Sequence, residues 1–328
     1  MKNLLFSCIL VLIYNGCSSK KYYEPSVELQ SYKKISDIND TILDYTSTGA
    51  TLKSGKYLYK DQVSTTSLKG GYVYLNRSEN TVLATNDNGS LDILGIKDNF
   101  HFDFDKKIVS GSKKDNILAL LFADNSLVLY DIKNKTIKYK EYLKESVLNN
   151  IQIASPVFLE SIVLFPTLDG KIILVNYKNF TKIKNINIDP KGQINNIIYL
   201  SNIKDTLVAA TNQKLFTFTD AQAHIKDFEI LHLTVNGKYI YLASLDGNII
   251  KLDQKLKIIK KRKFKFAKFV TIGTGKNYIY ALDTQGYLVS LDFDLNDLIV
   301  FDIPYKNDKK VFSLDNKIYF GDKYIKLD

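Results

Sequence analysis

Three histidines, His101, His224 and His232, are the side chains of this 328-residue sequence whose ordinary pKa suits proton transfer near neutral pH. None of them stands at a spacing that metal sites use. His101 and Asp103 are two positions apart, so on a strand their side chains would lie on one face. We interpret all three histidines as structural residues and predict no general base or metal ligand among them.

Residues 86–92, Asn-Asp-Asn-Gly-Ser-Leu-Asp, begin like a calcium-binding loop because oxygen-bearing side chains alternate around a glycine. The bidentate acidic residue that would close such a loop is missing at the required spacing. Asp87, Asp124, Asp169 and Asp246 occupy equivalent positions of a repeated pattern, where Asp favours turn conformations. The sequence also has no Gly-x-Ser-x-Gly motif, no glycine-rich phosphate loop and no dinucleotide fingerprint. It therefore predicts a protein that is not an enzyme and holds no metal or cofactor.

Residues 1–16 combine a short basic start with an apolar run over residues 4–13. That run is about half the ~20 residues that a membrane-spanning helix needs, so the segment predicts a signal peptide. The following Gly16-Cys17-Ser18-Ser19 resembles the processing site of bacterial lipoproteins, which are cut before a cysteine that then carries lipid. The resemblance implies that Cys17 is the lipid attachment site. Ordinary secretion with an unmodified Cys17 is the alternative.

Residues 17–38 are polar and show no sustained period, which predicts a lipidated tether in front of a single domain at residues 39–328. Ser18 stands where enteric lipoproteins kept at the inner membrane carry Asp. The lipoprotein resemblance therefore implies an outer-membrane lipoprotein whose domain faces the periplasm. Cys8 would leave with the signal peptide, so the domain would hold no free thiol and would depend on its core for stability.

The charge of the chain is basic, with 45 Lys and Arg against 35 Asp and Glu, a formal net charge of +10. The excess is concentrated in residues 255–268, where the basic residues are Lys255, Lys257, Lys260, Lys261, Arg262, Lys263, Lys265 and Lys268. An outer strand with a solvated face explains this run, and lysines on an edge also discourage pairing with other chains. The alternative is a patch for anionic lipid headgroups or an acidic protein. A signal sequence takes the chain out of the cytoplasm, so nucleic acid is not an expected partner.

The element that positions all these residues is a repeated β-hairpin, represented by residues 277–292, in which two β-branched and aromatic runs flank Asp-Thr-Gln-Gly. Six further copies lie at residues 81–94, 117–131, 162–176, 207–219, 239–253 and 317–328. Their turn residues, at 89, 125, 170, 213, 247, 286 and 322, are separated by steps of 34 to 45 residues. Each copy has further strands beside it. This spacing predicts an all-β propeller of four-stranded antiparallel blades, because a closed ring leaves only short unpaired edges.

The repeat predicts seven blades, and eight is the alternative if residues 56–69 are the remnant of another blade. The last copy ends after its third strand, so the outer strand of its blade must come from elsewhere. We expect residues 41–60 to supply it, which would close the ring with an N-terminal strand joining the C-terminal blade.

The hairpins at residues 240–253 and 279–292, which read strand, Asp-Gly or Gln-Gly, strand, Leu-Asp, resemble the repeat of PQQ-type β-propellers. Together with the N-terminus they are similar to the BamB family of propeller lipoproteins over residues 40–328. The sequence contains no Trp, which that family commonly uses to dock neighbouring blades, so Tyr and Phe must occupy those positions.

The resemblance implies a non-enzymatic, membrane-anchored scaffold that binds envelope proteins, above all the barrel subunit of outer-membrane protein assembly. A surface-displayed ligand-binding or adhesive propeller is the alternative. A quinone-dependent dehydrogenase shares the hairpin with this chain, but the Trp and calcium ligands of such enzymes have no counterpart here.

Overall fold

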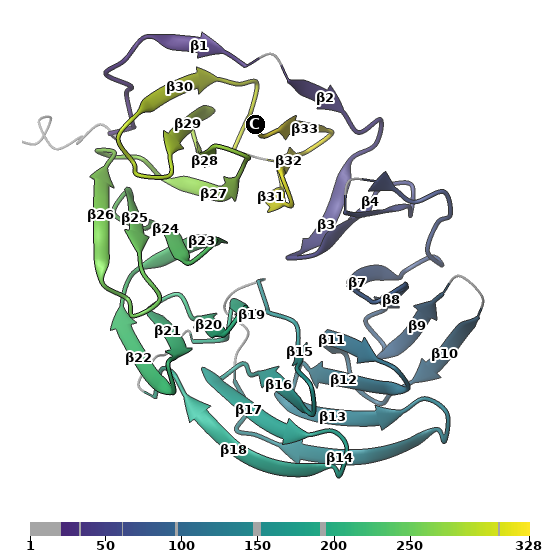
Figure 1. Cartoon of the computed structure of the whole chain (residues 1–328). Helices are drawn as coiled ribbons and strands as arrows, with labels where there is room; N and C mark the ends of the chain where they lie inside the picture. The colour runs from purple at the N-terminus through teal and green to yellow at the C-terminus, as the bar shows by residue number, and fades with distance from the viewer. Residues whose placement is uncertain are drawn as a thin grey trace, which may run out of the picture.

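The computed structural model describes residues 21–32, 34–60, 62–95, 98–146, 152–190, 195–307 and 309–328. They form a β-propeller of eight blades, each built on four antiparallel strands (Figure 1). The prediction of a propeller is confirmed, and the prediction of seven blades is wrong. Residues 42–63, which lack an Asp-Gly hairpin, form a complete first blade with short strands.

We number the blades in chain order. Blades 1 to 4 consist of β3 (Ile42–Thr46), β4 (Gly49–Leu52), β5 (Tyr57–Tyr59), β6 (Gln62–Val63), β7 (Val73–Ser78), β8 (Thr81–Thr85), β9 (Ser90–Leu94), β10 (Asn99–Asp103), β11 (Ile108–Lys114), β12 (Ile117–Phe122), β13 (Ser126–Asp131), β14 (Thr136–Tyr142), β15 (Val157–Phe158), β16 (Ile162–Pro166), β17 (Lys171–Asn176) and β18 (Thr181–Asn187).

Blades 5 to 8 consist of β19 (Tyr199–Ile203), β20 (Thr206–Ala210), β21 (Lys214–Thr219), β22 (Gln222–Asp227), β23 (Ile230–Asn236), β24 (Tyr239–Ser244), β25 (Asn248–Leu252), β26 (Ile258–Lys263), β27 (Phe269–Thr274), β28 (Tyr278–Asp283), β29 (Tyr287–Asp292), β30 (Leu298–Asp302), β31 (Val311–Leu314), β32 (Lys317–Phe320) and β33 (Lys323–Lys326). Two N-terminal strands, β1 (Leu29–Ser31) and β2 (Ile35–Asp37), join blades 7 and 8. In the described part of the chain every regular element is a strand, so there is no helix there that could cross a bilayer.

The repeated hairpin is the pair of second and third strands of a blade, as β28 and β29 show with the register Ala281 opposite Val289. Both faces of such a pair are covered by neighbouring blades, which is why its strands are almost continuously apolar. Gly247 makes the turn of the equivalent pair in blade 6 with a φ of +78°. A Cβ at Gly247 would lie 2.5 Å from the carbonyl oxygen of Phe264, so this turn requires glycine.

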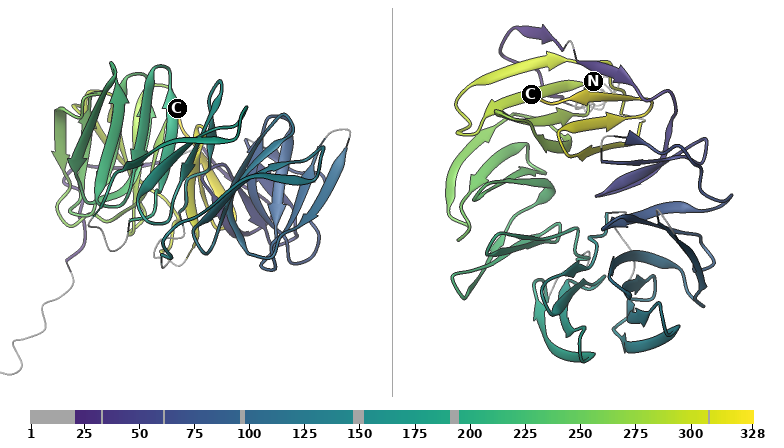
Figure 2. Two further views of the ribbon diagram at one scale, coloured as in Figure 1. Left: turned by 90° about the horizontal axis from the view of Figure 1, so that it is seen from below. Right: turned by 45° about the vertical axis from the view of Figure 1, so that its right-hand side comes forward.

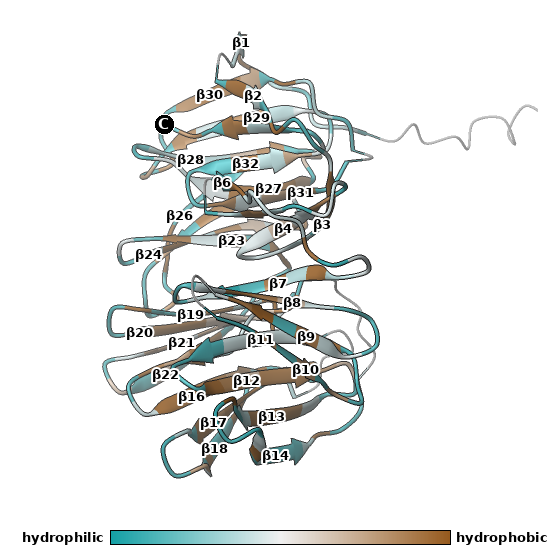
Figure 3. Cartoon of the chain, turned by 90° about the vertical axis from the view of Figure 1, so that its right-hand side faces the viewer, coloured by the Kyte–Doolittle hydropathy of each residue, from teal (hydrophilic) through white to brown (hydrophobic). Residues whose placement is uncertain are grey.

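The core lies between the blades as eight hydrophobic clusters, one at each contact between neighbours. Large aromatic side chains fill it without any Trp: Tyr241, Tyr319, Phe165, Phe216 and Phe320 are all fully buried. The hydropathy colouring of Figure 3 follows this arrangement, since central strands such as β12 and β13 are largely brown while many turns are teal. Each blade is therefore held by apolar surface on both sides.

The ring closes through β2, which pairs antiparallel with β33 as the outer strand of blade 8. Ile35 lies opposite Ile325, and the N–H of Ile38 donates to the carbonyl of Asp322 over 2.8 Å. Closure by an N-terminal strand is therefore confirmed. The expected segment, residues 41–60, is wrong, because those residues form the first blade and the closing strand precedes them.

Part of the expected tether belongs to the propeller. β1 adds to the edge of β30 as a parallel fifth strand, so β1 and β2 follow the outside of the last two blades (Figure 1). Tyr23 is buried between Phe264 and Tyr287, with ring centroids 5.8 Å from each. From Tyr23 onward, the segment predicted as a tether is thus held to the ring by aromatic packing and strand pairing.

Antiparallel strands give the ring two distinct faces, seen from the side in Figure 2 (left). The first turns of all blades and the third turns of blades 1 to 7 lie on one face, which we call the pocket face. The second turns, including those at Gly247 and Gly286, lie on the other face with the links between blades, which we call the connection face. Because Tyr23 packs beside the start of β29, the N-terminal segment reaches the ring at the connection face.

Candidate functional site

The innermost strands of the blades surround an axial channel that holds a cavity of about 410 Å³. Apolar side chains such as Ile198, Leu233 and Phe312 form much of its wall, and Gln152 and His232 add polar groups. His232 lies on β23, the innermost strand of its blade. Thr234, Thr271 and Asp315 also line the cavity, so its wall combines apolar and polar groups.

His232 keeps part of its surface open to the channel, but the surrounding protein lowers its pKa to about 4, because burial penalises the charged ring. The imidazole is therefore neutral at neutral pH. Its Nδ1 lies 3.4 Å from Nε2 of Gln152. Tyr45, which lines the same cavity, stacks on Phe312 with ring centroids 5.2 Å apart, and burial raises the pKa of its phenol.

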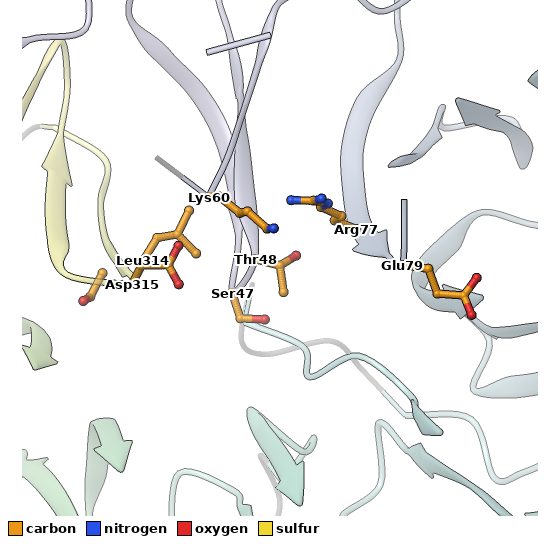
Figure 4. A pocket seen from close by; sticks show the side chains of 8 residues that line it. Ser47, Thr48, Lys60, Arg77, Glu79, Leu314 and Asp315 are labelled. Atoms are coloured by element: carbon orange, nitrogen blue, oxygen red, sulfur yellow. The ribbon is translucent and has the colours of Figure 1, made fainter. Parts of the chain in front are cut away.

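A second cavity, of about 460 Å³, lies on the pocket face beside the mouth of the channel (Figure 4). Its lining comes from turns of three blades: Ser47, Thr48, Lys60, Arg77, Glu79, Ser313, Leu314 and Asp315. Ser47, Ser313 and Asp315 also line the channel cavity, so the two spaces are adjacent. Lys60, Glu79 and Asp315 each have a positive φ, between 50° and 54°. The left-handed turns fix the backbone that carries these charged side chains.

None of the residues that line this second cavity was predicted from the sequence as a site residue. Its charged residues are spread over residues 60 to 315, on turns that only the closed ring brings together. No motif spacing connects them. The signal that could have found them is a charged residue at a hairpin turn where glycine or asparagine is usual, as at Lys60 and Asp315.

His101 and Asp103 lie on one face of β10, as predicted, with Nε2 of His101 3.3 Å from the Asp103 carboxylate. The Nδ1 of His101 is 2.6 Å from Asp92, and Lys69 binds the same Asp92 carboxylate at 2.9 Å. These contacts tie β9 and β10 of blade 2 to the segment that precedes β7. They are consistent with a structural role for His101. His224 lies on β22, an outer strand of blade 5 opposite Thr217, away from the channel.

The segment that resembles the start of a calcium loop is a turn. The Asn86 side chain accepts hydrogen bonds from the backbone N–H groups of Asn88 and Ser90, at 3.0 and 2.9 Å. Asp124 and Asp246 play the same part in later blades by binding the residues around their own turns. Within the described ranges, no three histidine, cysteine or acidic side chains are grouped so that they could hold a metal ion.

The basic run of residues 255–268 contains β26, the outermost strand of blade 6. It also includes part of the turn before β26 and the link to blade 7 after it. All seven of its lysines are exposed, whereas Arg262 is half-buried. Arg262 donates to the carbonyl of Leu295 over 3.1 Å and so joins blade 6 to blade 7. Lys255 pairs with Asp220 at 3.0 Å, and Lys263 pairs with Asp246 at 3.2 Å. Part of the run therefore stabilises the ring.

The remaining lysines of the run keep their charge available to solvent. Among the described residues, the ammonium groups of Lys257, Lys261 and Lys265, on β26 or within two residues of it, have no acidic partner. Exposed Ile258 and Ile259 lie in the same strand. The surface of β26 thus mixes cations with apolar side chains, a combination that the sequence analysis noted only for its charge. Cys17, the expected lipid attachment site, lies outside the described residues.

Comparisons with known proteins place the fold among β-propellers. No family model matches the chain. The BamB structure from Moraxella catarrhalis superposes with a TM-score of 0.66 at 13% identity, covering 91% of this chain and 99% of that one. The C-terminal WD40 domain of Sif2 superposes with a TM-score of 0.65 at 12% identity over the same shares. The resemblance to a BamB-like propeller therefore holds at the level of fold.

Sequence similarity leads to a different protein. The plasminogen-binding protein PgbB of Helicobacter pylori strain J99 is 32% identical over 233 residues, which cover 66% of this chain and 42% of that protein. PgbB of Helicobacter pylori strain 26695 is 24% identical over 387 aligned positions, covering 99% of this chain and 70% of that protein. The first alignment spans less than half of the relative's length. The chain is thus a BamB-like β-propeller in fold, with sequence relatives named for binding plasminogen.

Proposed function

We propose that this chain is a non-enzymatic binding propeller of the bacterial cell envelope, and that plasminogen is its protein partner. The observation that carries the proposal is the 24% identity to a plasminogen-binding protein over 99% of this chain. The similarity to BamB has only 13% identity and supports the fold alone. Of the functions open to a propeller, this sequence similarity favours a displayed ligand-binding protein.

The architecture suits such a role. A ring held by eight interblade clusters is a rigid support for many turns, and binding residues are commonly carried on turns of a rigid scaffold. The outer strand β26 carries Lys261, and Lys257 and Lys265 flank it, so cations without an acidic partner lie near exposed Ile258 and Ile259. Apolar contact combined with charge steering is what a protein partner with an acidic surface would use.

The test is surface plasmon resonance of the purified domain with plasminogen. We expect saturable binding that weakens about tenfold when Lys257, Lys261 and Lys265 are all changed to Gln, since rim charges mainly change the association rate. The matched control changes Lys133, Lys204 and Lys276 to Gln, which removes the same charge from other exposed positions. Equal loss in both triple variants would show that net charge, and not the β26 surface, governs binding. No binding by the unaltered domain would overturn the plasminogen proposal.

A second candidate is a scaffold for outer-membrane protein assembly. It is favoured by the superposition on BamB, which extends over 99% of that structure. Crosslinking in intact cells separates the two candidates. Capture of the barrel subunit of the assembly machinery would support the scaffold, and recovery of host proteins alone would support the displayed binding propeller. Dye-linked dehydrogenase activity with bound quinone would overturn both.

A further inference from the structure

The cavity on the pocket face contains two cationic groups that face each other. Figure 4 shows the Lys60 ammonium and the Arg77 guanidinium pointing toward one another across the space above Thr48. Among the described residues, neither side chain has a carboxylate partner within ion-pair distance. Two like charges facing one cavity repel each other, and an anion between them would relieve that repulsion.

Arg77 supplies a more specific signal. Its Nη1 atom is buried and has no hydrogen-bond acceptor in the described structure. The guanidinium is held in place by the Tyr59 ring, whose centroid lies 5.1 Å from Cζ. A buried donor without an acceptor is costly. Because Nη1 is closed to solvent, a ligand in the cavity would meet the other guanidinium N–H groups of Arg77. A guanidinium presents paired donors whose geometry matches a carboxylate.

The wall around these cations is already ordered. Thr48 donates its hydroxyl to Asn76 over 2.9 Å, and Asn76 in turn donates to the carbonyl of Gly111 and to Ser112. Glu79 lies at the other side of the cavity, but Lys113 pairs with its carboxylate at 3.2 Å. The Glu79 charge is therefore compensated from outside the pocket.

The net charge of the side chains that line the cavity indicates which class of anion it would bind. Lys60 and Arg77 contribute two positive charges, and Asp315 contributes one negative charge that is not ion-paired in the described structure. The surplus is a single positive charge. A monoanion balances it, whereas a phosphate dianion would overcompensate it and be repelled by Asp315. The 460 Å³ volume leaves room for an organic group attached to the anion.

We propose that this pocket binds a small organic carboxylate, with the carboxylate oxygens on Arg77 and Lys60 and the organic part over the mouth of the channel. The carboxylate belongs to a free small acid or to the C-terminus of a peptide, and both present the same chemistry to the site. This site is separate from the β26 surface and does not depend on the identity of the protein partner.

Isothermal titration calorimetry with the full domain tests the proposal, using succinate monomethyl ester, an alanine pentapeptide with a free or an amidated C-terminus, and inorganic phosphate. We expect saturable binding of a probe with one free carboxylate and none of the amidated peptide. Binding of the ester alone identifies a free acid, and binding of the free peptide alone identifies a chain terminus. Failure of both carboxylates, or tighter binding of phosphate, would overturn the proposal.

Variants that should change the ligand affinity in opposite directions distinguish an effect on the site from a loss of folding. Lys60→Gln changes an exposed side chain and should weaken binding about threefold to tenfold, and Arg77→Gln should weaken it at least about tenfold. Asp315→Asn removes the opposing charge and should tighten binding severalfold, which a damaged fold would not do. Lys133→Gln is the matched control and should bind like the unaltered protein. Unchanged affinity in Lys60→Gln and Arg77→Gln would contradict the site.

Discussion

Burial of His232 beside the channel links the stability of the ring to pH. The pKa falls from its ordinary value of 6.5 to about 4 in the folded chain, so the unfolded chain binds this proton more readily. The contribution to stability is fully present above about pH 6.5 and is lost as the pH falls through that value toward 4. The free energy of unfolding should decrease over this window by at most about 3 kcal/mol.

Urea denaturation at several pH values between 7.5 and 4.5 measures this slope. His232→Phe cannot be protonated and should flatten it relative to the unaltered protein, because the aromatic ring keeps much of the packing. His224→Gln, which changes a histidine on an outer strand, is the control and should keep the slope. Asp246 does not interfere, because hydrogen bonds from Ser244, Asn248 and Lys263 outweigh its burial and hold its pKa near 2. A parallel decline in His232→Phe would show that other groups carry the effect.

Single residues differ in how far they could be predicted. The exposure of Lys260 and Lys261 could be predicted, because a strand so rich in lysine fits the outer position of a blade. The Asp residues at turns follow from their own conformational preferences. Arg77 and Lys60 could not be predicted as partners, because they meet only when blades 1 and 2 pack. Local patterns determine which face a side chain takes, whereas the approach of two blades determines which side chains share a cavity.

The two N-terminal strands make unequal contributions to closure. β1 covers an edge of a blade that is already complete, whereas β2 supplies a missing strand and covers the edge of β33. Ile325, opposite β2, is completely buried, and Ile35 packs against the same cluster. Removal of β2 should therefore destabilise the ring cooperatively, because it exposes an apolar edge as well as breaking strand pairing.

Two truncated chains test this difference by thermal unfolding. A chain that begins at residue 33 lacks β1 and keeps β2, and a chain that begins at residue 39 lacks both. We expect the second to lose about 3 kcal/mol more than the first, which lowers the melting temperature by roughly a further 6 to 12 °C. Ile35→Asp should act like the longer truncation, while Asp37→Ser, which removes an exposed ion pair with Lys323, should cost little. Equal melting temperatures for the two truncations would refute closure by β2.

Elements were predictable where the repeat is regular. All seven predicted hairpins are second and third strands of a blade, because two β-branched and aromatic runs around a turn rich in Asp, Asn and Gly favour a hairpin. Blade 1 was missed because its second turn uses Gly55 after Lys53 and Ser54, and its outer strand β6 has only two residues. The closing strand β2 was missed because three polar-flanked residues carry no periodicity of their own. Pairing with β33 is what makes it a strand.

If Cys17 carries lipid, the ring has a defined orientation relative to the membrane. The chain meets the ring at the connection face, where Tyr23 is buried, so a lipid six residues earlier would hold that face toward the bilayer. The pocket face, with Arg77 and Lys60, would then point away from it. Such an orientation leaves the carboxylate pocket accessible to solutes.

Metabolic labelling with palmitate tests this attachment. Cys17→Ser should lose the label and leave the membrane fraction, because acyl chains contribute about 0.8 kcal/mol per buried CH₂ and stable anchoring needs more than one chain. Cys8→Ser, which alters the cysteine of the expected signal peptide, should keep both label and location. Equal labelling of all three proteins would exclude Cys17 as the attachment site.

Closure by β2 also has a consequence for the order of events during synthesis. Asp37 of β2 and its partner Lys323 of β33 are 286 positions apart, so β2 is synthesised long before β33. At the usual 5–20 residues per second, a growing chain carries β2 without its partner for roughly 15 to 60 s. Blades 1 to 7 have their own strands by then and can pack against each other. The ring can therefore close only after β33 has been made, and closure then depends on the pairing of two short strands from opposite ends of the chain.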